Sequence, residues 1–272
     1  MSNLHCLASL ALLALTASTA SFAQTAGPWN GKQCAVVLTY DDALAVDLNH
    51  VVPALDSLKL RGTFYLIGSS PVVAARLPEW RRAALRGHEL GNHALMHPCD
   101  GSLPGRNFVT PDNDLSKYTI SRAVNEVRAT NTLLTAIDGK TARTFAYPCG
   151  DRQIGGVYFY EQLKNDFVGA RGVTAGLQPL AQVDLANINS YMINGQSGDY
   201  LINLVKQAQR SRTLLVFLFH GVGGGHGLNV ELAAHRQLLR YLQAHEQDIW
   251  VAPMVEVAEK MKASKEGSGG SK

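Results

Sequence analysis

Apolar runs of strand length alternate with segments of helical periodicity along most of this chain. Residues 34–40 and 213–219 are the clearest strands, because both are continuous apolar runs, the first with Val and Leu and the second with Leu, Val and Phe. Such runs are typical of strands that are buried on both faces, as in a parallel sheet. Alternation of strand and helix that is sustained without a repeat or an internal linker predicts a parallel α/β fold.

Polar residues of interest follow the predicted strands, at their carboxyl ends. Further strands are expected at residues 62–67, 88–91, 143–147, 167–170, 186–193 and 249–252, and helices at residues 48–60, 72–85, 120–137, 158–164, 200–209, 230–244 and 254–261. An open sheet binds ligands at one switch point, whereas a barrel collects residues from many strand ends. Polar side chains after four or more strands therefore favour a (β/α) barrel. The long irregular insertion at residues 98–119 is expected to be functional.

The two ends of the chain are expected to lie outside this domain. Residues 7–20 are an apolar run dominated by Leu and Ala, and small residues follow at positions 21 and 23. This pattern is typical of a signal peptide, here residues 1–23, and predicts a secreted or periplasmic protein. The alternative is an N-terminal membrane anchor, for which the run is short. Residues 24–264 would form a single domain, and the Gly- and Ser-rich residues 265–272 a flexible tail.

Charge and cysteine content limit the classes of partner. The formal net charge of +3 is mild, and the sequence has no basic run with interleaved aromatic residues, so it does not predict nucleic-acid binding. No apolar stretch after the signal is long enough to cross a membrane. Three cysteines remain beyond the signal, Cys34, Cys99 and Cys149, which allows one disulfide and one free thiol. Oligomeric state leaves no signal in the sequence.

Two histidines four positions apart, His93 and His97, are candidate metal ligands. At this spacing both side chains point the same way if the backbone makes a helical turn, and neutral imidazole binds zinc and its first-row neighbours. A catalytic metal usually has a third protein ligand. Asp41 and Asp42 follow a predicted strand, and one carboxylate could bind a metal while the other accepts a proton. Taken alone, this pair is more often a helix cap.

A further histidine stands where the apolar strand 213–219 ends. His220 is a candidate general acid, because imidazole titrates near neutral pH. The alternative is a histidine that is held by local backbone groups, and its position alone leaves both open. His226 lies among glycines and is interpreted as a loop residue, and His88 is interpreted as structural.

Taken together and in order, these motifs resemble the polysaccharide deacetylases with NodB homology, carbohydrate esterase family 4. Residues 39–42 match the family's first motif, with Tyr40 where Phe is usual, and residues 87–98 match the second, with Ala94 where Ser or Thr is usual. Further similar segments are residues 62–68, 145–150, 218–220 and 250–259. The ordered set is much more specific than any single motif.

The resemblance implies a deformed (β/α) barrel of about seven parallel strands, of NodB type, and an enzyme that removes acetyl groups from a glycan. It also implies a divalent metal, usually Zn²⁺, with Co²⁺, Ni²⁺ or Mn²⁺ as alternatives. The implied ligands are Asp42, His93 and His97.

The resemblance assigns a catalytic role to three further positions. Asp41 would take a proton from the attacking water, and His220 would protonate the leaving group. The backbone N–H of Tyr147 would stabilise the oxyanion.

Two positions depart from the family pattern. Ala146 stands where an arginine often tethers the base, and Arg171 is the candidate to replace that arginine, with a surface arginine as the alternative. The aspartate that tunes the acid histidine is not clear, and Asp184 is the nearest candidate.

The resemblance also suggests where the disulfide lies. If His97 and Tyr147 line one site, Cys99 and Cys149 lie near each other, since each is two residues further along the chain. We predict a Cys99–Cys149 disulfide, which an exported protein permits. The alternative is that one of these cysteines is a soft metal ligand.

Three functions remain open on this basis. The first is metal-dependent deacetylation of an N-acetylated glycan such as chitin, peptidoglycan or poly-N-acetylglucosamine. The second uses the same residues on acetyl esters, as in acetylxylan. The third is a glycan-binding protein without turnover, and the intact set of predicted site residues argues against it. Substrate choice would depend on the loops at residues 98–119 and 221–228.

Overall fold

A parallel sheet of eight strands forms the centre of the computed structural model, which describes residues 28–269. The strands are β1 (Cys34–Asp41), β2 (Thr63–Leu66), β3 (Glu89–Asn92), β4 (Thr144–Ala146), β7 (Gly169–Arg171), β8 (Tyr191–Met192), β9 (Leu214–Phe219) and β12 (Ile249–Val251). Their order is β7-β4-β3-β2-β1-β9-β8, and β12 also pairs with β1. Short pairs outside this sheet are β5 (Gln153–Ile154) with β6 (Val157–Tyr158), and β10 (Gly221–Val222) with β11 (Asn229–Val230).

Strand β1 is the most enclosed strand of the sheet. All eight of its residues are buried. Strand β9 pairs with one edge of β1 through Ala35–Tyr40, so β12 and β2 share the other edge, at its beginning and its end respectively. The continuous apolar run that predicts this strand therefore reflects burial on both faces and pairing along both edges.

The sheet closes through an irregular segment, which makes the barrel deformed. Ile188 bridges to Arg171 at the outer edge of β7, and the Ile188 N–H donates to the carbonyl of Ala170 at 2.8 Å. The chain then continues into β8, which pairs with β9. The strand expected at 186–193 is thus regular only over Tyr191–Met192, because polar side chains such as Ser190, which donates to the Gly172 carbonyl, compete with ladder bonding.

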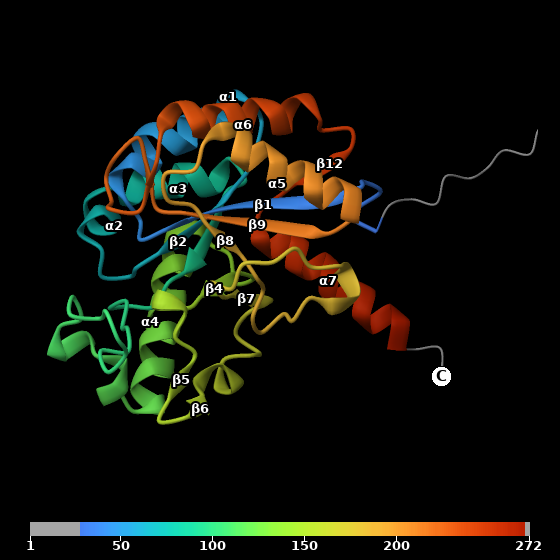
Figure 1. Ribbon diagram of the computed structural model, residues 1–272. Helices are drawn as coiled ribbons and strands as arrows, with labels where there is room; N and C mark the ends of the chain where they lie inside the picture. Colours follow the sequence, from blue (N-terminus) through green and yellow to red (C-terminus); the bar gives the residue numbers. More distant parts are fainter. Residues whose placement is uncertain (1–27, 270–272) are drawn as a thin grey trace, which may run out of the picture.

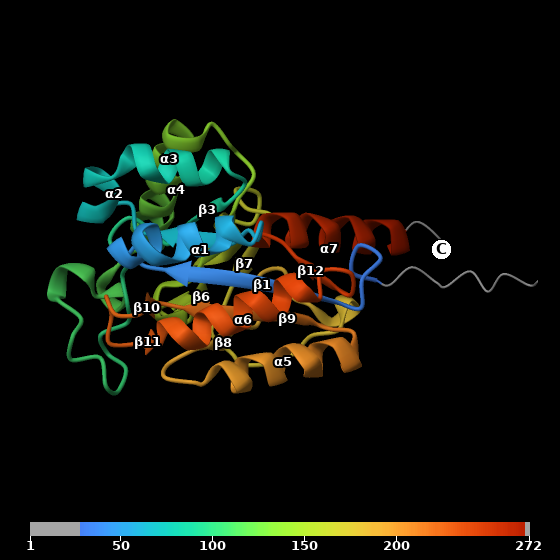
Figure 2. The same ribbon diagram turned by 90° about the horizontal axis from the view of Figure 1, so that it is seen from above.

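Helices cover the outside of the sheet (Figures 1 and 2). They are α1 (Val52–Ser57), α2 (Pro71–Ala75), α3 (Leu77–Leu85), α4 (Ile120–Asp138), α5 (Gly198–Ser211), α6 (Leu232–Ala244) and α7 (Met254–Gly269). Helices α5 and α6 pack side by side, and their apolar faces join the largest core cluster together with β1, β2 and β9. No helix of this described part is long and apolar enough to span a bilayer.

Several predicted helices differ in detail from the observed ones. The helix expected at 48–60 begins with a π-helical turn, η1 (Asp47–Val51). The helix expected at 72–85 breaks at Arg76, because Pro78 cannot donate to the preceding turn. The segment 158–164 forms only a short 3₁₀ turn, Phe159–Gln162.

The carboxyl-terminal prediction also needs a correction. Helix α7 runs to Gly269, so residues 265–269 continue a helix where a flexible tail is expected, and the Lys265 ammonium donates to the Val183 carbonyl. Adding residues to an established helix costs little compared with starting one, which explains why weak helix formers extend it. The predicted signal peptide lies outside the described residues.

A buried carboxylate joins three strands to the last helix. The Glu89 side chain on β3 accepts from the backbone N–H and hydroxyl of Thr144 on β4, the hydroxyl of Thr63 on β2 and the N–H of Val255 in the first turn of α7. The four distances are 2.7–2.8 Å. Burial raises the pKa of Glu89, and these four donors oppose that rise. The side chain therefore satisfies donors that would otherwise be buried without a partner.

We expect Glu89→Ala to lower the free energy of unfolding by about 3 kcal/mol, because several buried donors lose their acceptor. Urea denaturation measures this. The control is Glu161→Ala, since the Glu161 side chain is 69% exposed beside Lys164, and its loss should change stability by less than about 0.5 kcal/mol. Equal denaturation midpoints for the two variants would contradict the structural role of Glu89.

Candidate active site at the carboxyl ends of the strands

A cavity of about 520 Å³ lies at the carboxyl ends of the barrel strands. It is lined by six of the seven predicted site residues: Asp41, Asp42, His93, His97, Tyr147 and His220. They come from the ends of β1, β3, β4 and β9. The seventh, Arg171 at the end of β7, is outside this lining, and its guanidinium donates a hydrogen bond to the Asp41 carboxylate. The structure therefore brings all seven together, as the barrel prediction requires.

Asp42, His93 and His97 converge on one point. The His93 Nε2 and His97 Nε2 atoms each lie 3.5 Å from Asp42 Oδ1, and one ligand atom from each of the three residues lies within 4.8 Å of the others. The edge of a tetrahedron of ligands at zinc–nitrogen distance is about 3.3 Å. Asp42 Oδ1 is also buried without a hydrogen-bond partner among the described residues. These three residues fit a first-row divalent cation.

The turn that presents the two histidines is not helical. Ala94 has φ 61° and His97 has φ 52°, so the backbone enters the left-handed region twice between them. The two rings therefore meet without a helical turn, with centroids 4.7 Å apart. Asn92 fixes the turn, because it donates to the Val127 carbonyl on α4 and accepts from the Ala94 N–H. Left-handed backbone at non-glycine residues is often found at functional sites.

His93 is held in the form that a metal ligand needs. Its Nδ1 donates to the Ala146 carbonyl at 2.9 Å, which leaves Nε2 facing Asp42. Burial lowers the pKa of His93 to about 3, so the imidazole is neutral near pH 7. A backbone carbonyl on the second nitrogen is a common way to orient a histidine ligand.

Asp41 forms a buried ion pair with Arg171. Asp41 Oδ2 accepts from Arg171 Nη2 at 2.5 Å, and the guanidinium also lies over the Tyr65 ring, 5.1 Å from its centroid. Arg171 is fully buried, so the alternative of a surface arginine is wrong. Burial alone would raise the pKa of Asp41, but Arg171 and the neighbouring histidines hold this pKa below its ordinary value. The Asp41 carboxylate is therefore ionised near neutral pH.

Two predicted roles conflict with observed contacts. The Tyr147 N–H, the expected oxyanion donor, donates to the Arg171 carbonyl at 3.2 Å because this residue continues the pairing of β4 with β7. Asp184, the candidate for tuning His220, is exposed and accepts from the Ala186 N–H. Among the described residues, nothing hydrogen-bonds to the buried Nδ1 of His220.

Sequence reasoning missed several residues of this cavity. His226, interpreted as a loop residue, lies with its Nε2 atom 3.9 Å from Asp42 Oδ2. Phe108 and Met192 add exposed apolar side chains to the rim, beside Arg106. The glycines on both sides of His226 were the available signal, since a run of glycines can fold a loop back on itself.

A disulfide joins Cys99 and Cys149, as predicted, with a Cα–Cα distance of 5.7 Å. Cys149 lines the cavity, and Arg106 in the insertion donates to its carbonyl and pairs with Asp151 at 3.1 Å. With both sulfur atoms bonded to each other, neither is a thiolate ligand. Cys34 is buried and free. The insertion 98–119 is thus tied to the end of β4.

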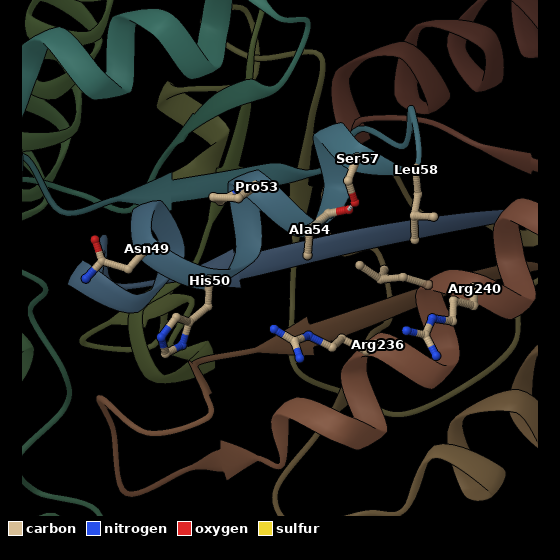
Figure 3. A pocket seen from close by; sticks show the side chains of 9 residues that line it. Asn49, His50, Pro53, Ala54, Ser57, Leu58, Arg236 and Arg240 are labelled. Atoms are coloured by element: carbon tan, nitrogen blue, oxygen red, sulfur yellow. Dashed lines mark hydrogen bonds between the residues drawn. The ribbon is translucent and has the colours of Figure 1, made fainter.

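A second cavity, of about 380 Å³, lies on the outside of the barrel between α1 and α6 (Figure 3). Arg236 and Arg240 on α6 face the side chains of η1 and α1 across it. Its lining includes no carboxylate and none of the predicted site residues. His50 at its end lies with Nδ1 2.9 Å from the Val222 carbonyl, at the base of the 221–230 loop.

Comparisons with known proteins assign the chain to a family. Residues 30–164 match the polysaccharide deacetylase family model. The chain belongs to this family, and its barrel is of the NodB type.

The chain is also similar to two curated relatives and, in fold, to a solved structure. Identity is 28% over 130 residues to a peptidoglycan-N-acetylglucosamine deacetylase of Bacillus cereus, which corresponds to 46% of this chain and 39% of that protein. Identity is 28% over 138 residues to a gellan lyase of a Bacillus species, which is 50% of this chain and 4% of that protein. The chain therefore spans well under half the length of either. A Mycobacterium smegmatis protein assigned to the polysaccharide deacetylases has the same fold, with a TM-score of 0.62, 15% identity, and coverage of 86% of this chain and 92% of that one.

We expect a double variant, Cys99→Ala with Cys149→Ala, to lower the free energy of unfolding by about 2–4 kcal/mol, because the bond closes a long loop. The two residues are 50 apart in sequence. Denaturant titration measures the loss, and peptide mapping before and after reduction identifies the bonded pair. A bond that includes Cys34, or no change in stability, would contradict the prediction.

Proposed function

We propose that this protein is a metal-dependent deacetylase of an N-acetylated glycan. The observation that carries the proposal is the convergence of Asp42, His93 and His97 beside the ion-paired carboxylate of Asp41. The family and the curated relative named for peptidoglycan N-acetylglucosamine support an amide substrate. Signal cleavage near residue 23, a secreted or periplasmic location and a single domain over residues 24–264 belong to the same proposal.

A divalent cation, Zn²⁺ or alternatively Co²⁺, Ni²⁺ or Mn²⁺, would be held by Asp42, His93 and His97. When bound, it would lower the pKa of a coordinated water and polarise the acetyl carbonyl. Each histidine would contribute Nε2, since Nδ1 of His93 is taken by a backbone carbonyl. Asp42 would contribute Oδ1, the buried oxygen without a hydrogen-bond partner among the described residues.

Asp41 would act as the general base. Its Oδ2 is engaged by Arg171, and its buried Oδ1 has no hydrogen-bond partner in the described part of the chain. An ionised carboxylate with one free oxygen next to the proposed metal position can accept a proton from water.

His220 would act on the opposite side of the reacting group. Its Nε2 lies 4.0 Å from Asp42 Oδ2, and the ring lines the cavity. As an imidazolium it would give its proton to the leaving amine, after which acetate and the deacetylated sugar depart. A Tyr147 N–H contribution to oxyanion binding would first require this donor to leave the Arg171 carbonyl.

The same geometry would also serve an acetyl ester, as in acetylxylan, which is the second candidate function. An ester needs less help from an acid, since an alcohol is a better leaving group than an amine. A protein that binds glycans without turnover is the third candidate, and the paired base and acid argue against it.

Acetate release from a panel of acetylated glycans distinguishes these functions. We expect chelator-treated protein to release acetate from N-acetylglucosamine oligomers or peptidoglycan only after Zn²⁺ or a related cation is restored. Asp41→Asn and His93→Ala should each lower kcat/KM by at least about 100-fold. Asp184→Asn is the matched control and should retain full activity. Release from acetylxylan alone would support the esterase, and metal binding without any release would support the third function.

We expect Arg171→Met to lower kcat/KM near neutral pH by about 10- to 100-fold. Without the guanidinium, burial raises the pKa of Asp41, so the base is ionised only at higher pH and the acidic limb of the profile moves to higher pH. Arg171→Lys keeps a positive charge and should restore part of the activity. The pH dependence of kcat/KM at saturating metal measures this shift. An unchanged acidic limb in a folded Arg171→Met variant would contradict the tethering role.

A further inference from the structure

We propose that His226 positions the ring of His220, a role that rests on the function proposed above. The two imidazoles are stacked, with centroids 4.8 Å apart and planes inclined by 15°. Their Nε2 atoms lie at nearly equal distances, 4.0 Å for His220 and 3.9 Å for His226, from Oδ2 of Asp42. The two nearly parallel rings therefore both direct Nε2 toward the same carboxylate oxygen.

Among residues 28–269, none forms a hydrogen bond that fixes the ring of His220. Its Nδ1 is buried and without a partner in the described part of the chain, and Asp184 lies elsewhere. An acid or base histidine is usually oriented by a hydrogen bond to the nitrogen that does not face the substrate. Here the neighbouring ring of His226 limits rotation of His220 by contact.

His226 is itself held in place. The Leu228 N–H donates to Nδ1 of His226 at 3.0 Å, so Nδ1 is the acceptor and the proton of the neutral ring is on Nε2. The side chain is 36% exposed, so His226 forms the outer layer of the stack and His220 the inner one.

The loop between β10 and β11 has the backbone geometry that this stack needs. Gly223, Gly224 and Gly225 all have positive φ, from 70° to 115°. A Cβ at Gly225 would lie 2.9 Å from the Val46 side chain, and a Cβ at Gly221 would lie 2.4 Å from the carbonyl oxygen of Gly224. Only glycine satisfies both the torsions and the close approach.

Contacts at the base of the loop limit its movement. The Asn229 side chain accepts from the Gly224 N–H at 2.8 Å. The Nδ1 atom of His50, which lines the cavity shown in Figure 3, lies 2.9 Å from the Val222 carbonyl oxygen. A loop that is closed at its base and folded by glycines keeps His226 against His220.

Two other roles for His226 are less well supported. The proposed metal ligands are Asp42, His93 and His97, whose ligand atoms lie within 4.8 Å of one another, and His226 is outside this group. A direct hydrogen bond from Nε2 to the substrate would need the nitrogen but not the aromatic ring. Variants can separate that role from stacking.

Three substitutions test the proposal. His226→Phe keeps a flat ring, His226→Asn keeps an acceptor for the Leu228 N–H without a ring, and His226→Ala removes both. If stacking positions His220, the Ala and Asn variants should lose about 10- to 100-fold in kcat with little change in KM, and the Phe variant should stay within about threefold of the original protein. His245→Ala, which removes a comparable ring stacked on Tyr241 at 4.0 Å, is the matched control and should be unchanged.

The outcomes separate this proposal from the proposed function. Equal activity of all His226 variants and the original protein, or a Phe variant as impaired as Ala while Asn retains activity, would overturn the positioning role. Absence of acetate release from the unmodified, metal-loaded protein would instead reject the proposed function. Crystal structures of the Ala and Phe variants give a readout independent of turnover, because the His220 ring should rotate in the first and keep its plane in the second. A retained ring plane in both would also overturn the proposal.

Discussion

A buried ion pair crosses the inside of the barrel and connects its two sides. Asp41 lies at the end of β1 and Arg171 at the end of β7, and three strands separate β1 from β7 in the sheet. Breaking a buried pair leaves an uncompensated charge and typically costs about 3–5 kcal/mol. The pair therefore fixes the distance between the two sides of the site and also keeps Asp41 ionised. The same ion pair thus stabilises the closed barrel and sets the protonation state of Asp41.

The pKa of the neighbouring aspartate, Asp42, shifts in the opposite direction to that of Asp41. Burial and the adjacent Asp41 carboxylate raise the pKa of Asp42. The backbone turns into the left-handed region at Asp42, with φ 77°, so two consecutive carboxylates point to different partners. A cation next to Asp42, His93 and His97 would compensate its charge, as Arg171 compensates that of Asp41. This difference in partners is the physical basis for assigning one aspartate to the metal and the other to proton transfer.

Features that follow from burial and local chemistry were predictable from sequence. Strands β1 and β9 were found almost to the residue, because buried parallel strands are continuous apolar runs. The strand-end rule placed the site residues together, since parallel strands end on one face of a barrel. The irregular closure of the barrel was not predictable in the same way, because it depends on hydrogen bonds such as that of Ser190 to a distant carbonyl. His226 was missed for a similar reason: its position depends on glycine torsions and not on residue type.

The proposed substrate recognition and the proposed chemistry involve different parts of this fold. The barrel holds Asp41, Asp42, His93 and His97 at or after the ends of β1 and β3, whereas the insertion 98–119 and the 221–230 loop lie over the same end of the barrel (Figures 1 and 2). The insertion is tied down by the disulfide and brings Arg106 and Phe108 to the rim. The other loop is shaped by glycines and brings His226 against His220. Because this second loop contributes Leu228 to the cavity lining and also carries the stacked ring, a change of its length would alter both the shape of the cavity and the surroundings of His220.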